Sequence, residues 1–258
     1  GSVRTDVLPV DPVIGVGEIA ISDHRSSQPT LDELLRIASE AHVAGLLAGK
    51  AGVVHLHAGG GDRGLELVRQ AIHDSELPPR TFHPTHVNRR RRLFEEALEL
   101  AESGGAIDVT AFPPPADEDD DELTVVEAFR RHRSTYLPAD GLTISSDAGG
   151  SLPCFDPAGR VTSMGVGDPA ALVGALQDLL AADVPLEEAL PPFTSNVAAL
   201  WRLPRKGRIE PGADADLVVL DAEGAVRDVM ARGRWRVRRS ETLVPGMFEH
   251  SVEGDDLG

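Results

Sequence analysis

Four side chains with metal-binding chemistry recur through the sequence at wide intervals. Glu18 lies within the apolar run VIGVGEIAI, and His57, His86 and Asp147 follow it at separations of roughly one or two strand–helix repeats. Imidazole nitrogens and carboxylate oxygens are ligands for zinc and similar divalent ions. A carboxylate in a buried strand is costly without a positive partner, and bound cations would supply that partner to Glu18. The four residues therefore predict a metal centre in which Glu18 bridges two ions.

These residues are expected near the carboxyl ends of parallel strands. Apolar runs predict five strands, at residues 13–21, 52–59, 80–87, 106–112 and 141–150. Segments with helical spacing of apolar residues alternate with them, and the first begins with Thr30 and Glu33 at capping-box separation. This alternation predicts an α/β fold with a parallel sheet, doubly wound or closed as a barrel, whose chemistry collects where the strands end. The strand at 106–112 is expected to provide no ligand.

The last part of the chain has a different pattern. Two helices are predicted after Asp147, at residues 169–182 and 186–200. From about residue 203, short strands alternate with turn residues and no long helix follows. We therefore expect a small C-terminal β domain that begins between residues 201 and 207.

The other histidines are interpreted by their positions in the predicted strands. Only one of His55 and His57 is expected to face the mouth of the sheet. His83 and His86 are an odd number of residues apart and are expected to point to different faces. The predicted ligands are therefore His57 and His86, and five more histidines are expected at the surface: His24, His42, His73, His132 and His250.

Composition limits the classes of partner. The chain has 258 residues, 41% of them hydrophobic, which is enough for a substantial core. Its net charge of −17 argues against nucleic acid or an anionic membrane as a partner, and no apolar run is long enough for a membrane-spanning helix. The single cysteine, Cys154, excludes an internal disulfide and fits a cytoplasmic location. The acidic run at 116–122 is expected to be a solvated loop.

Other motifs have competing interpretations. GVGEIA at 15–20 matches a loose dinucleotide-binding pattern, but no strand precedes it and no helix follows at once. The glycine-rich run at 58–62 suits either a phosphate site or a flexible loop near the site. Asp147 could simply cap a turn at the glycines that follow it. No sequence signature of a serine or cysteine nucleophile is present.

Several stretches resemble the isoaspartyl dipeptidase (β-aspartyl peptidase) family of the amidohydrolase superfamily. They are AISDHRS, GVVHLHAG, PTHVNR, LTISSDAGGS and KGRIEPGADADLVVL, in family order along nearly the whole chain. The resemblance implies a (β/α)8 TIM-like barrel that holds two zinc ions, together with a β-sandwich domain. It implies that His57 and His86 bind one zinc, and that Asp147 binds the other and acts as the catalytic general base.

The resemblance also implies a substrate and a reaction. Arg25 and Arg89 match arginines that hold the substrate's carboxylates, and Ser151 matches a substrate-contacting serine. The implied activity is that of a metallopeptidase: a zinc-activated hydroxide cleaves the amide bond of a small isoaspartyl dipeptide. An N-acyl amino acid deacylase or a cyclic amidase is the alternative hydrolase. Family members assemble into larger oligomers, so a homo-oligomer is expected.

Two departures from the family pattern stand out. Glu18 takes the place of a lysine that is carboxylated to bridge the metals, and a glutamate also offers two oxygens, on a shorter arm. No His-x-His motif precedes Glu18, although the family carries one on its first strand. We therefore expect residues 1–202 to form strands 4–8 of the family barrel and residues 203–258 part of the sandwich. On this interpretation the chain is the C-terminal part of a longer protein, either enzymatically inactive alone or a non-catalytic fragment.

Overall fold

The computed structural model describes residues 2–112, 121–155 and 160–245, without the side chains of residues 153–155. Most of the acidic run at 116–122 and the side chain of Cys154 therefore lie outside the described residues. The chain forms two compact units that meet at Leu203 and Pro204.

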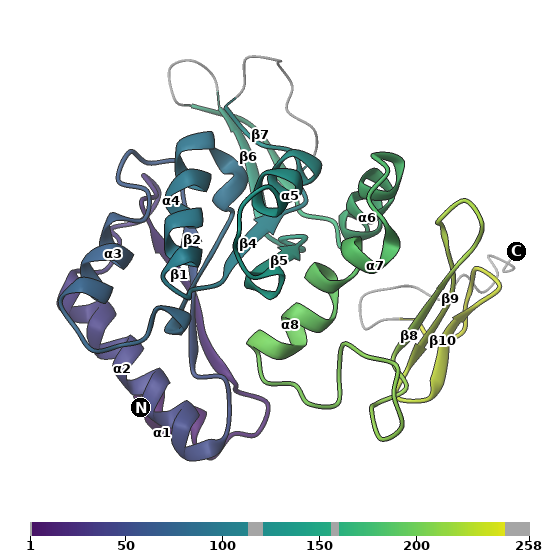
Figure 1. Cartoon of the computed structure of the whole chain (residues 1–258), viewed down its shortest axis with the longest axis horizontal. Helices are drawn as coiled ribbons and strands as arrows, with labels where there is room; N and C mark the ends of the chain where they lie inside the picture. Colours follow the sequence, from purple (N-terminus) through teal and green to yellow (C-terminus); the bar gives the residue numbers. More distant parts are fainter. Residues whose placement is uncertain (1, 113–120, 156–159, 246–258) are drawn as a thin grey trace, which may run out of the picture. The chain divides into compact units, whose positions relative to one another are not determined.

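Five short parallel strands form the centre of the first unit. β1 (Gly15–Ile21), β2 (Val53–Ala58) and β3 (Phe82–Thr85) make one parallel sheet, and β4 (Ile107–Thr110) and β5 (Leu142–Ser145) make a parallel pair (Figure 1). The Asn88 side chain joins the two groups, because its amide donates to the Thr110 carbonyl at 3.0 Å and accepts from the Thr110 amide at 2.9 Å. The predicted α/β fold with parallel strands is confirmed.

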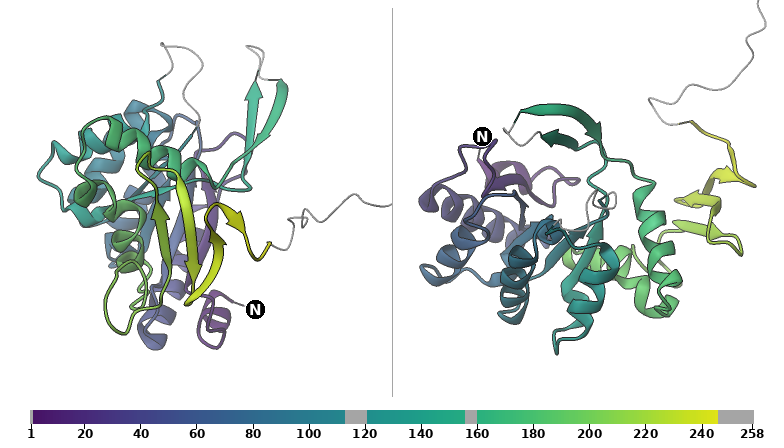
Figure 2. Two further views of the ribbon diagram at one scale, coloured as in Figure 1. Left: turned by 90° about the vertical axis from the view of Figure 1, so that its right-hand side faces the viewer. Right: turned by 90° about the horizontal axis from the view of Figure 1, so that it is seen from above.

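Helices cover the outer side of these strands. They are α2 (Leu31–Ala48), α3 (Glu66–His73), α4 (Arg91–Glu102) and α5 (Val125–Arg133), with the short α1 (Val3–Val7) before them (Figure 2). The predicted capping box is present, since the Thr30 hydroxyl accepts from the Glu33 amide and the Glu33 carboxylate accepts from the Thr30 amide. Fully buried side chains from strands and helices, such as Leu34, Phe82 and Phe94, form the core between the two layers. The core thus fixes the strands whose ends carry the candidate ligands.

Short 3-10 turns lead into and out of the strands. η1 (Pro79–Thr81) precedes β3 and η2 (Val87–Arg89) follows it, while η3 (Ala139–Gly141) precedes β5. The turn after β3 matters most for the site, because it contains Arg89 and follows directly on His86.

Two parts of the first unit differ from the prediction. β6 (Ser151–Phe155) and β7 (Val161–Val166) form an antiparallel hairpin where the sequence indicated no strand. α6 (Ala171–Ala181) matches the predicted helix, but the single helix expected at 186–200 is wrong. It is divided into α7 (Leu186–Ala189), η4 (Pro191–Phe193) and α8 (Ser195–Leu200), because consecutive prolines interrupt helical hydrogen bonding.

The second unit contains an antiparallel sheet of β8 (Leu217–Leu220), β9 (Val226–Ala231), β10 (Arg234–Arg238) and β11 (Glu241–Thr242), in the order β11-β10-β9-β8. Its β character agrees with the prediction for the end of the chain. Among the described residues, no helix is long and apolar enough to cross a membrane.

Candidate metal centre

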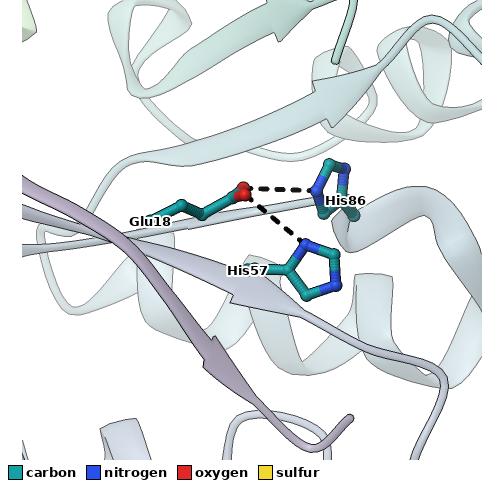
Figure 3. Close-up of side chains that lie close together, drawn as sticks. All are labelled: Glu18, His57 and His86. Carbon is teal, nitrogen blue, oxygen red and sulfur yellow. Dashed lines mark ion pairs between the residues drawn. The ribbon is translucent and has the colours of Figure 1, made fainter. Parts of the chain in front are cut away.

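A bulge in β1 determines where Glu18 points. Val16 pairs with Val54 and Ile19 pairs with Leu56, so Gly17 and Glu18 together face one residue of β2. Bulges of this kind redirect a side chain next to functional sites. Gly17 has φ +150°, a conformation that other residues rarely adopt. A Cβ at this position would also lie 2.8 Å from the carbonyl oxygen of His55 on β2, so no other residue fits. The bulge turns Glu18 toward the neighbouring strands although its strand is largely apolar (Figure 3).

Glu18 meets two imidazoles from consecutive strands. Glu18 Oε2 lies 3.7 Å from His57 Nδ1, and Glu18 Oε1 lies 3.3 Å from His86 Nε2 (Figure 3). One ligand atom from each residue lies within 4.8 Å of the other two. Two ligands of one tetrahedral zinc ion are about 3.4 Å apart, so these separations suit a shared cation. We call Glu18, His57 and His86 the ligand trio.

The far nitrogen of His57 is held by an acid that the sequence analysis missed. Asp23 Oδ2 lies 2.9 Å from His57 Nε2, and it also accepts from Arg25 Nη2 at 2.8 Å. With the ring proton on Nε2, the lone pair of Nδ1 faces Glu18. A carboxylate behind a ligating histidine is the usual support of a metal-binding imidazole. The signal for Asp23 was its place in SDHR, two residues before an arginine already under consideration.

His86 offers an unsatisfied nitrogen to the same point. The residue ends β3 with φ +62° and is only 1% exposed. Its Nδ1 lies 2.7 Å from the Thr110 hydroxyl, whereas its buried Nε2 has no hydrogen-bond partner among the described residues, despite the nearby Glu18. A buried imidazole nitrogen without a partner is costly, and a metal ion would satisfy it. The trio therefore fits a divalent cation in both donor chemistry and geometry.

The electrostatics favour the metal-binding protonation states. The His57 and His86 imidazoles hold the pKa of the Glu18 carboxyl well below its usual range, despite its partial burial. Burial lowers the pKa of His86, and the Arg25 guanidinium holds the pKa of Asp23 well below its usual range. Glu18 is thus ionised and His86 uncharged near neutral pH, as metal ligands must be.

Asp147 lies at the same end of the strands but outside the ligand trio. It follows β5 with φ +50°, and its carboxylate packs against Gly150, where a Cβ would collide with it. The backbone turns at residues 147–150, where the Gly150 N–H donates to the Asp147 carbonyl at 2.9 Å. Its charge acts on Arg25, His86 and Arg89, which places it at the mouth with them.

The other candidate residues surround this mouth. Arg25 Nη2 donates a hydrogen bond to Asp23 Oδ2 and also lies 3.3 Å from His57 Nε2. Arg89 lies over Phe112, with its Cζ 5.0 Å from the ring centroid, and its buried Nε has no partner among the described residues. Ser151 begins β6 and is exposed.

Three expectations about the histidines are wrong. His55 also faces Glu18, with its Nε2 4.0 Å from Oε1, because residues two apart on a strand share a face. His83 and His86 both point inward, since the left-handed turn at His86 breaks the strand alternation. His132 is likewise buried rather than at the surface, while His250 lies outside the described residues.

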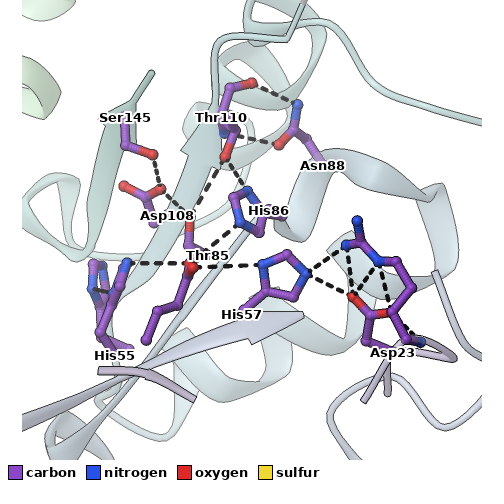
Figure 4. A network of polar contacts seen from close by, with 12 residues as sticks. Asp23, His55, His57, Thr85, His86, Asn88, Asp108, Thr110 and Ser145 are labelled. Carbon is purple, nitrogen blue, oxygen red and sulfur yellow. Dashed lines mark hydrogen bonds and ion pairs between the residues drawn. The ribbon is translucent and has the colours of Figure 1, made fainter. Parts of the chain in front are cut away.

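Beneath the ligand trio lies a second polar layer. His55 Nδ1 lies 2.9 Å from His83 Nδ1, and His83 Nε2 lies 3.1 Å from the Thr143 hydroxyl. The chain of contacts ends at Asp108, which is 2% exposed and accepts from Thr143 at 2.5 Å. Asp108 also accepts from the Ser145 and Thr85 hydroxyls (Figure 4). We call His55, His83, Thr143 and Asp108 the inner layer. No residue of β4 had been expected to contribute to the site.

Comparison with known proteins gives one matching family model and three similar solved structures. A family model described as amidohydrolase family matches residues 96–246. A crystal structure of β-aspartyl dipeptidase from Fervidobacterium islandicum AW-1, in complex with β-Asp-Leu, has a TM-score of 0.87 and 40% identity over 96% of this chain. A second structure of β-aspartyl dipeptidase from that organism has a TM-score of 0.83 and 38% identity, again over 96% of this chain. A D-hydantoinase from Bacillus sp. AR9 shares the fold, with a TM-score of 0.57 and 16% identity over 92% of this chain and 67% of its own.

The chain is shorter than these relatives. It spans 64% and 62% of the two β-aspartyl dipeptidase chains. The resemblance predicted from the sequence motifs is confirmed by these matches.

Proposed function

This chain belongs to the amidohydrolase family, and on that premise we propose that it carries most of the catalytic site of a zinc-dependent hydrolase that cleaves isoaspartyl dipeptides. The observation that supports this best is the ligand trio, in which the buried His86 Nε2, which makes no hydrogen bond to the described residues, lies 3.3 Å from the Glu18 carboxylate. The β-aspartyl dipeptide is the natural candidate substrate, because the relative at 40% identity binds β-Asp-Leu.

Each residue of the mouth has a task in this reaction. His57 Nδ1, His86 Nε2 and the Glu18 carboxylate would hold zinc, with Glu18 shared between two ions. The metal, when bound, lowers the pKa of water and polarises the substrate carbonyl. Asp147 would bind at the second ion, take the proton of the attacking water and pass it to the leaving amine.

The arginines explain a preference for substrates with extra carboxylates. The Arg89 guanidinium is fixed against Phe112 and keeps a buried N–H without a partner. Arg25 is held by Asp23 at the edge of the trio. Both could bind a substrate carboxylate through paired N–H groups, and an isoaspartyl dipeptide has two free carboxylates. Ser151 would add a hydroxyl contact at the rim.

The same proposal covers the architecture. The five parallel strands would be strands 4–8 of a (β/α)8 barrel, and the antiparallel sheet of the second unit would be part of a β-sandwich. A homo-oligomer is proposed on the same family grounds.

The test combines metal content with turnover. Purified full-length protein that contains this chain would be loaded with zinc, its metal measured by elemental analysis, and leucine release followed with β-Asp-Leu and with α-Asp-Leu. We expect release from β-Asp-Leu alone, and loss of that release in Asp147→Asn, which should still bind the ion at Glu18, His57 and His86. Zinc-loaded full-length protein that releases no leucine from β-Asp-Leu would overturn the proposal. Turnover of N-acetyl amino acids or hydantoins instead would support the alternative hydrolase.

A further inference from the structure

The inner layer contains two histidines that the proposed reaction does not use. The rings of His55 and His83 lie 4.9 Å apart, and the indole of Trp201 meets both edge-on at 6.0 Å. His83 is 2% exposed, and burial lowers its pKa to about 3, so the ring is uncharged. One of the two Nδ1 atoms must therefore donate to the other.

The contacts of Asp108 decide which nitrogen donates. Its carboxylate accepts from the hydroxyls of Thr143, Thr85 and Ser145, at 2.5, 2.6 and 2.5 Å. The Thr143 hydroxyl donates to Asp108 Oδ1, so the Thr143 proton points to Asp108. Thr143 Oγ1 then accepts from His83 Nε2, which leaves His83 Nδ1 without a proton.

The proton positions in the inner layer also determine which nitrogen of His55 carries its proton. Since His83 Nδ1 has no proton, it accepts from the Nδ1–H of His55 at 2.9 Å. A ring proton on Nδ1 belongs to the tautomer with a lone pair on Nε2, and this Nε2 lies 4.0 Å from Glu18 Oε1. A lone pair and a carboxylate oxygen repel each other unless a cation lies between them. The inner layer thus presents His55 to Glu18 in the form in which a metal-binding histidine is held.

We propose that His55 is a further metal ligand, which binds a second cation that Glu18 shares with the His57–His86 ion. This inference rests on the metal centre of the proposed function. Among the described residues, only Glu18, His57 and His86 have ligand atoms that all lie within 4.8 Å of one another, and His55 is not in this group. His55 therefore contacts the Glu18 carboxylate in the way expected for the ligand of a separate ion. A side-chain adjustment of about 0.6 Å would bring Nε2 and Oε1 to the separation of two ligands on one tetrahedral ion.

Cobalt(II) titration of the whole chain tests this inference. The unchanged chain, His55→Gln and His83→Phe would be titrated, with cobalt counted by elemental analysis and its environment followed by visible absorption. His132→Gln is the control, because His132 is a buried histidine on α5 that has no hydrogen bond to the site. Circular dichroism of each metal-free variant would verify that it is folded.

We expect two ions per chain in the unchanged protein and in His132→Gln, and one in His55→Gln. In His83→Phe, where His55 is intact but loses its acceptor, the second ion should bind 10- to 100-fold more weakly. Two equally tight ions in His55→Gln, or a single ion in the unchanged chain, would overturn the assignment of His55. An unchanged chain that binds no cobalt would instead refute the metal centre of the proposed function.

Discussion

Replacement of Asp23 by asparagine tests whether the acid behind His57 prepares that ring for metal. The Asp23 side chain is 4% exposed, and its Oδ2 lies 2.9 Å from His57 Nε2. The carboxylate keeps the ring proton on Nε2 and leaves Nδ1 free beside Glu18. An asparagine can turn its NH2 toward the ring, which favours a proton on Nδ1, the nitrogen that should bind the ion.

The size of the effect follows from the contacts that are lost. Removal of an outer carboxylate of this kind costs about 10- to 100-fold in metal affinity, or about 1.4 to 2.8 kcal/mol. Asp23 also accepts from Arg25 Nη2, and that guanidinium lies 3.3 Å from His57 Nε2. Without the acid, the arginine places an uncompensated positive charge beside the ring. We therefore expect a loss in the upper half of the range.

The assay is competition for zinc between the chain and a chromogenic chelator at neutral pH. Asp62→Asn is the matched control, because Asp62 also pairs with an arginine, Arg90 at 3.3 Å, but its side chain is 96% exposed. We expect unchanged affinity in that control. An Asp23→Asn chain that binds zinc as tightly as the unchanged chain would refute the role given to Asp23.

Three further predictions concern stability. Burial lowers the pKa of His132 to about 4. Between pH 6.5 and pH 4, His132 is therefore protonated in the unfolded chain and uncharged in the folded chain. The free energy of unfolding falls as the pH is lowered through this range, by about 2 kcal/mol at pH 5. His132→Leu should remove this loss in urea unfolding at pH 7 and pH 5, and an unchanged difference between the two pH values would contradict it. Gly17→Ala should destabilise the fold by about 1–3 kcal/mol and weaken zinc binding, whereas Gly104→Ala, which also has positive φ but open space around it, should leave zinc binding intact. Removal of zinc with a chelator should lower thermal stability by about 3 kcal/mol when zinc had been present at 100 times its dissociation constant, and an unaltered melting temperature would contradict metal binding at the trio.

The strands were predictable because their apolar runs are bounded by glycine, proline and polar residues. Val54, Ile107 and Ile144 in these runs are at most 4% exposed, and strands buried in this way have a nearly continuous apolar pattern. The hairpin of β6 and β7 was missed because the described side chains of β7 are exposed, so no apolar pattern marks it. The helix predicted at 186–200 was wrong because the prediction used the spacing of apolar residues and ignored Pro191 and Pro192, which interrupt the helix.

The site was predictable in its residue types and less so in its geometry. Glu18, His57 and His86 converge because parallel strands bring their ends together. The bulge at Gly17, the left-handed turn at His86 and the support from Asp23 are set by tertiary contacts, which periodicity does not encode. His55 was set aside by an error in strand alternation.

The bulge that carries Glu18 has a consequence for how the centre assembles. A lysine at this position would need to react with dissolved carbon dioxide before it could offer two oxygens, whereas the Glu18 carboxylate has both oxygens in the folded chain. The extra residue in β1 turns this shorter side chain toward His57 and His86. Zinc binding at the proposed centre should therefore not depend on bicarbonate.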